Sequence, residues 1–183
     1  MDDSCTERGG ASVLLKEDLT ATERLLVWAI RVWVAHHRAG AVPCRGYSYA
    51  FVRVGLPDAP LLLHRFMQLI AANARRGINI RCIGCPQVSP DERRVLTALA
   101  AAQRGELAVV QALLRDVIED STVNWVHAVL ATLAAQMTTP EHRLPRRDRG
   151  TGERREATPA LTGPMLSGPA RPACVDPGGS LVH

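Results

Sequence analysis

Apolar side chains recur at helical spacing along most of the chain between residues 19 and 137. Leucine, isoleucine, valine and alanine lie three, four and seven positions apart, which places them on one face of a helix. Several such segments follow one another and are separated by glycine or proline. The pattern therefore predicts an all-α fold, a small bundle of five to six helices.

The first predicted helix, in "LTATERLLVWAIRVWVAHHRAG", has clear start and end signals. Residues 20–23 form a Thr-x-x-Glu capping box, and Gly40 suits the left-handed conformation that often follows a helix. Arg24, Arg31 and Arg38 lie seven positions apart, so we expect them to form one polar stripe. Apolar side chains cover most of the remaining surface, which indicates a central position in the bundle.

The next segment, residues 42–57, fits two structures. Tyr47, Phe51 and Val54 have helical spacing, whereas Tyr47, Tyr49 and Phe51 alternate as in a strand. We favour a short helix that ends at Gly55, because the neighbouring segments are helical.

A further helix is predicted to begin with Asp58 as N-cap and Pro60 in the first turn, where the missing N–H of proline does no harm. Gly77 is expected to end it. Arg75 and Arg76 would then lie in the last turn, where the helix dipole favours positive charge.

The remaining segments alternate between an extended stretch and helices. "INIRC", residues 78–82, alternates as an extended connector without an obvious partner strand. Residues 89–92, Ser-Pro-Asp-Glu, form a second capping box with proline at the first helical position. Gly105 divides the following pattern into a helical hairpin, and residues 121–137 supply a last helix.

Composition changes at residue 138. Residues 138–183 contain seven of the twelve prolines and six of the fourteen glycines, without an apolar period. Such a segment buries too little apolar surface to offset its ordering entropy, so we expect a disordered tail, or a frame-shifted or run-on C-terminus. We expect a flexible leader at 1–18 and one helical domain at 19–137.

Charge is unevenly distributed. The chain has 21 arginines and a single lysine, Lys16; residues 24–81 contain nine arginines and one acid, whereas residues 82–120 contain four arginines and six acids. The basic half allows a nucleic-acid-associated regulator. It equally allows a basic surface that docks on the acidic half of the same chain, which we favour because no recognition motif accompanies the charge. The candidate nucleic-acid residues are Arg24, Arg31, Arg38, Arg53, Arg75 and Arg76.

Two cysteines three positions apart, Cys82 and Cys85, allow three interpretations. A structural zinc site needs four ligands, which here would require Cys44 and a histidine such as His64. A redox pair of the thioredoxin type would lie at a helix N-terminus within a βαβ unit, and that pattern is absent. We favour a turn in which both cysteines act as small apolar residues. Zinc is the only cofactor that these residues suggest.

No hydrolase, nucleotide-binding or metalloprotease motif occurs, so no catalytic residue is assigned and we lean against an enzyme. The three tryptophans have helical spacing and are expected in the core. The acidic N-terminus does not resemble a secretory signal, and the odd number of cysteines argues against a disulfide framework. These features predict a cytoplasmic protein without a membrane partner.

The stretch "RCIGCPQVSPDERRVLTALAAAQRGELAVVQALL", with the capped tryptophan-containing helix before it, resembles a group of small uncharacterised helical bacterial proteins. These proteins combine a cysteine turn, a Ser-x-Asp-Glu helix start and an "AAxQRG" hairpin. The resemblance covers about residues 19–135 and implies no activity. The sequence thus predicts a non-catalytic module that interacts with or regulates another protein, and an exposed apolar groove between helices would favour that function.

Overall fold

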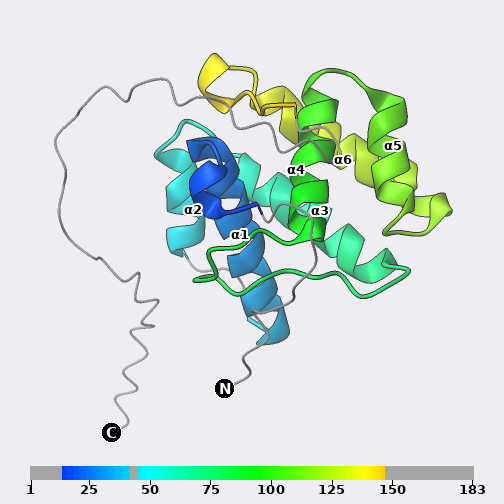
Figure 1. The fold of residues 1–183 in the computed structure, drawn as a ribbon, viewed down its shortest axis with the longest axis horizontal. Helices are drawn as coiled ribbons and strands as arrows, with labels where there is room; N and C mark the ends of the chain where they lie inside the picture. Colours follow the sequence, from blue (N-terminus) through cyan, green and yellow to red (C-terminus); the bar gives the residue numbers. More distant parts are fainter. Residues whose placement is uncertain (1–13, 42–44, 147–183) are drawn as a thin grey trace, which may run out of the picture.

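The computed structural model describes residues 14–41 and 45–146. The all-α prediction is confirmed: the described residues form six α-helices and contain no strand (Figure 1). The helices are α1 (Ala21–Arg38), α2 (Arg45–Val52), α3 (Ala59–Asn73), α4 (Pro90–Gln103), α5 (Leu107–Arg115) and α6 (Val123–Gln136). None of the helices in this part of the chain is long and apolar enough to cross a membrane.

Helix α6 packs against α3, α4 and α5, and α1 packs against α2, α3 and α4. The two groups share α3 and α4, so one continuous apolar core runs between them. Burial of this core is the main favourable contribution to folding. The sequence supplies it with aliphatic side chains, and Phe51 and Phe66 are fully buried among them.

Both predicted capping boxes are present. The Thr20 hydroxyl accepts a hydrogen bond from the Glu23 amide at 3.2 Å, and the Glu23 carboxylate accepts one from the Thr20 amide at 2.8 Å. Ser89 and Glu92 form the same pair of bonds at the start of α4. The chain leaves α1 and α4 through Gly40 and Gly105, both with positive φ, which glycine adopts without strain. These elements were predictable because each signal lies within a few residues.

The α3 helix ends earlier than predicted. It stops at Asn73, and Ala74 is extended and bridges to Ile118. The Arg75 amide donates to the Val117 carbonyl at 2.8 Å, so pairing with the segment after α5 replaces the last helical turn. The expectation that Arg75 and Arg76 lie in a helix end is therefore wrong. Asp58 precedes α3 as predicted but makes no side-chain capping bond.

Trp125 does not pack in the core. Its exposed fraction is 72%, because the buried positions of α6 include Val123, Val126 and Leu130, and residue 125 points away from that face. Trp33 is buried as expected, and its indole N–H donates to His64 Nδ1 at 2.9 Å.

The chain beyond the helices also packs on the bundle. Leu14 and Lys16 pair with residues 86–88 through backbone hydrogen bonds. The chain after Met137 continues through a 3-10 helix, Pro140–His142, and buries the Leu144 side chain. The expected leader and tail therefore pack here in part, whereas residues 1–13 and 147–183 lie outside the described residues.

Gln103, at the end of α4, holds the segment after α6. Its amide nitrogen donates to the carbonyls of Met137 and His142, and its oxygen accepts from the Leu144 amide at 2.9 Å. We expect Gln103→Ala to lower the free energy of unfolding by about 1–3 kcal/mol, because it leaves partly buried backbone groups unpaired. Urea unfolding measures this. Gln68→Ala, at an exposed position of α3, is the matched control and is expected to change stability by less than about 0.5 kcal/mol.

Candidate functional site

A buried ion pair lies between α1 and the start of α4. Arg31 donates from Nε and Nη2 to the two carboxylate oxygens of Glu92, at 2.7 and 2.8 Å. Both side chains are 0% exposed. The planar guanidinium matches the carboxylate in a bidentate fork, which is the strongest form of such a pair. Glu92 is also the N3 residue of the second capping box, so one carboxylate serves the helix start and the ion pair together.

The cysteine turn supplies the remaining acceptors of Arg31. Its Nη1 donates to the carbonyl oxygens of Cys82 and Cys85, at 3.1 and 2.6 Å, and its Nη2 donates to the Gln87 carbonyl at 2.6 Å. Backbone carbonyl oxygens of the loop thus surround the buried guanidinium group of Arg31. Lys16 also contacts this loop, because its ammonium group donates to the Ile83 carbonyl at 2.7 Å.

A second carboxylate, Asp91, joins the start of α4 to the segment after α3. It accepts from Arg76 in a bidentate pair at 2.7 and 3.0 Å, from the Asn79 amide at 2.8 Å and from Arg94. Burial raises the pKa of Asp91, but hydrogen bonds from Arg76 and the Asn79 amide outweigh it, so the pKa lies below its ordinary value.

The two carboxylates fix the connector between α3 and α4. The amides of Asn79 and Arg81 donate to Asp91 and Glu92, and the Ser89 hydroxyl donates to the Asn79 carbonyl at 2.5 Å. Residues 77–82 therefore form a connector without helix or strand, and hydrogen bonds hold it beside the start of α4. The connector passes α1 and α4 in Figure 1.

An apolar groove of about 270 Å³ lies between α1, α3 and this connector. Helix α1 contributes Trp33 and Val34, and the connector contributes Ile78 and Ile80; Met67, Ile70, Ala71 and Ala74 line the side formed by α3 and the residue after it. The ionisable side chains among its lining residues are all basic: His37, Arg38 and Arg76. The groove thus combines an apolar floor with one exposed arginine at its edge, Arg38, because Arg76 is paired with Asp91 and Asp116.

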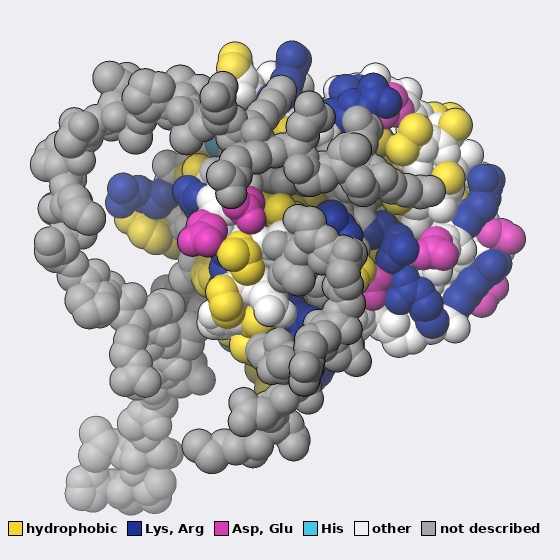
Figure 2. Space-filling view, viewed as in Figure 1, with side chains coloured by type: hydrophobic (Ala, Val, Ile, Leu, Met, Phe, Trp, Pro, Cys, Tyr) yellow, Lys and Arg dark blue, Asp and Glu magenta, His cyan; other side chains and the backbone are white. Residues whose placement is uncertain are grey.

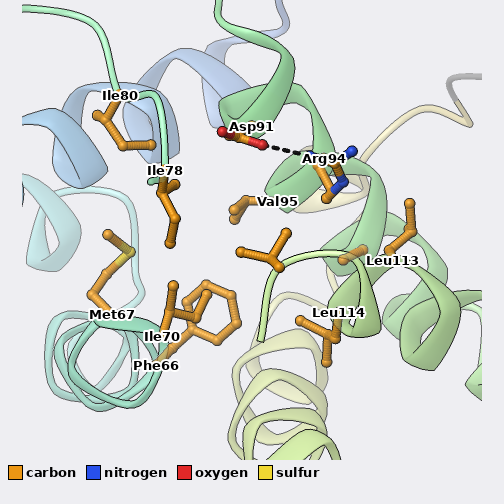
Figure 3. Close-up of a pocket in the computed structure, with 12 residues that line it drawn as sticks. Phe66, Met67, Ile70, Ile78, Ile80, Asp91, Arg94, Val95, Leu113 and Leu114 are labelled. Atoms are coloured by element: carbon orange, nitrogen blue, oxygen red, sulfur yellow. Dashed lines mark hydrogen bonds and ion pairs between the residues drawn. The ribbon is translucent and has the colours of Figure 1, made fainter. Parts of the chain in front are cut away.

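A small cavity of about 20 Å³ lies on the other side of the connector. Its walls are apolar side chains of α3, α4 and α5, with Asp91 and Arg94 at one edge (Figure 3). This volume admits about one water molecule. The cavity and the groove share Met67 and Ile70 of α3 and Ile78 and Ile80 of the connector, so they are neighbours.

The six arginines predicted as nucleic-acid contacts differ in their burial and in their ion pairs. Arg31 is buried, so the expectation of an exposed stripe is wrong at its middle residue. Arg75 pairs with Glu119 and Asp120, and Arg76 pairs with Asp91 and Asp116. The basic half therefore docks in part on the acidic half, and Figure 2 shows basic and acidic side chains side by side. Arg24, Arg38 and Arg53 are exposed.

The candidate metal residues are not gathered in the part of the chain that is described. Cys82 is exposed, Cys85 is buried, and His64 accepts the Trp33 bond through Nδ1. Cys44 lies outside the described residues. Among residues 14–41 and 45–146 no group of three or more histidine, cysteine, aspartate or glutamate side chains is placed to hold a metal ion. Zinc binding stays a prediction.

Comparisons with known proteins give no assignment. No protein-family model, curated protein or solved structure matches the chain. The resemblance to small helical bacterial proteins thus stays a prediction, and function has to be argued from the site itself.

Removing one partner of the buried ion pair should be costly. We expect Arg31→Met to lower the free energy of unfolding by about 3–5 kcal/mol, because the Glu92 charge is left buried without its partner. The double variant Arg31→Met/Glu92→Gln should lose less than the sum of the two single variants. Arg38→Met, an exposed arginine of the same helix, is the control and should change stability by less than about 0.5 kcal/mol in the same urea titrations.

The lowered pKa of Asp91 predicts acid sensitivity. A carboxyl group whose pKa is lower in the folded chain stabilises the fold above its ordinary pKa of about 3.9, and that contribution is lost as the pH falls through the folded value. Asp91→Asn should therefore reduce stability near neutral pH and flatten the loss of stability below about pH 5. Thermal unfolding across this pH range measures both effects. An unchanged slope in Asp91→Asn would contradict the assignment.

Proposed function

We propose that this chain is a protein-interaction module that binds a short apolar segment of another protein in the groove between α1, α3 and the connector. The observation that carries the proposal is the groove itself, whose floor is the edge of the core, with the buried side chains of Trp33, Met67 and Ile70 beside the half-buried Ile78 and Ile80. Exposed apolar concavities of this kind are typical of sites for amphipathic helices or peptides.

The charge of the rim indicates the chemistry of the partner. Arg38 borders the groove beside His37, Arg76 is paired with Asp91 and Asp116, and no acidic residue lines the groove. Arg38 is exposed and has no ion pair to a described residue. A segment with apolar side chains and flanking carboxylates would complement this surface, and its charges would speed association and fix its orientation.

The size of the groove favours a few side chains over a cofactor. Pockets for small molecules typically occupy about 300–1,000 Å³ and enclose most of the ligand. At about 270 Å³ the groove is below that range. Two or three apolar side chains of a peptide therefore fit it better than a whole small-molecule ligand.

The nucleic-acid alternative is less favoured because Arg31 is buried and Arg75 and Arg76 are paired with acids. Arg24, Arg38 and Arg53 would remain for phosphate contacts.

We also propose a cytoplasmic location, where a chain with an odd number of cysteines stays reduced.

A matched pair of variants tests the groove. Ala71 and Ala72 are neighbouring exposed residues of α3, but only Ala71 lines the groove. Glutamate at either position costs the helix about the same, whereas at position 71 it also fills the groove and opposes an acidic ligand. Peptides selected from a displayed random library on the full chain should be apolar with acidic flanks. Their Kd should rise about tenfold or more in Ala71→Glu, a loss of at least about 1.4 kcal/mol, and stay unchanged in Ala72→Glu.

Fluorescence anisotropy of the labelled peptides gives these affinities, and raising the salt concentration should weaken binding. Selected peptides that bind both variants equally well, or a selection without any consensus, would contradict the proposal. Salt-sensitive binding of a random DNA or RNA duplex that persists in Ala71→Glu would favour the nucleic-acid alternative instead.

A further inference from the structure

The turn that holds the buried arginine also brings its two cysteines together. The Cys85 amide donates to the Cys82 carbonyl at 3.1 Å, which closes a four-residue turn. A turn of this kind keeps its first and fourth Cα atoms within about 7 Å. Disulfides join Cα atoms about 4.4–6.8 Å apart. The backbone turn therefore allows the Cα atoms of Cys82 and Cys85, both thiols in the structure, to lie at the separation that a disulfide spans.

The rest of the fold holds this geometry in place. Arg31 donates to the carbonyls of both cysteines, and Lys16 donates to the Ile83 carbonyl between them. Four hydrogen bonds, including the internal bond of the turn, thus hold the loop. An unfolded chain would have to find that conformation at an entropic cost, so the native turn is preorganised for closure.

The two thiols differ in access. Cys82 is exposed, whereas only 3% of Cys85 is exposed. Attack by a soluble oxidant on the chain therefore begins at Cys82, and Cys85 is placed next to it to resolve the product. An accessible cysteine beside a resolving cysteine is the arrangement of reversible redox sites.

From this geometry we infer that Cys82 and Cys85 are a reversible thiol–disulfide site that reacts with low-molecular-mass disulfides such as oxidised glutathione. The Cys82 thiolate attacks one sulfur of the oxidant, forms a mixed disulfide and releases one thiol. The Cys85 thiolate then attacks the Cys82 sulfur, forms the Cys82–Cys85 bond and releases the second thiol. The protein loses two electrons and two protons, and the oxidant gains them. The site is separate from the groove, so it can be tested without a peptide ligand.

Peptide mapping of the full chain tests this. Trypsin cleaves after Arg81 and Arg93, and the peptide 82–93 contains these two cysteines without Cys5, Cys44 or Cys174. After equilibration in glutathione buffers and alkylation, the oxidised peptide should be unalkylated and lighter by two hydrogen atoms, and a dithiol reductant should reverse this. The equilibrium constant for oxidation should be about tenfold or more higher in the native chain than in urea.

Variants separate the two roles. Cys85→Ser should accumulate a glutathione adduct on Cys82, because no thiol resolves it, and Cys82→Ser should react far more slowly at the buried Cys85. Cys44→Ser should leave the 82–93 disulfide unchanged. A persistent glutathione adduct in the wild-type chain, a cross-link between Cys82 or Cys85 and Cys44, or equal oxidation in native and urea-unfolded chain would each overturn the inference.

Discussion

The fold depends on one buried guanidinium. Arg31 reaches from the middle of α1 to the first turn of α4, where it meets Glu92 and three backbone carbonyls of the preceding loop. Burying a charge is unfavourable unless every donor has a partner, and the whole segment from Cys82 to Glu92 is arranged to provide partners. The same carboxylate caps α4 and accepts from the Arg81 amide, so helix start, loop and connector all make hydrogen bonds to this ion pair.

Local signals predicted much of this architecture, and long-range contacts decided the rest. The capping boxes at Thr20 and Ser89 were predictable because donor and acceptor lie three residues apart. The burial of Arg31 was not predictable, because its partner Glu92 is 61 positions away. Its spacing of seven residues from the exposed Arg24 and Arg38 suggested a polar stripe instead. The early end of α3 has the same origin, since the Asn73 carbonyl accepts from the Glu119 amide and the Arg75 amide donates to the Val117 carbonyl after α5.

The groove could not be predicted from the sequence, for a related reason. Its lining residues come from two helices and an extended connector, and only the packed structure brings them together. That residues 78–82 lie outside the helices was predictable, but not that Ile78 and Ile80 would line both the groove and the small cavity. The segment after Met137 lacks an apolar period and was expected to be disordered, yet Gln103 holds its backbone against the bundle.

The hydrogen bonds that hold the connector, residues 77–82, affect how a ligand would be recognised. The connector's amides donate to Asp91 and Glu92, which belong to the start of α4 and not to the groove, so these bonds need no bound segment. A segment bound in the groove, as proposed, would meet a preformed surface and lose mainly its own freedom.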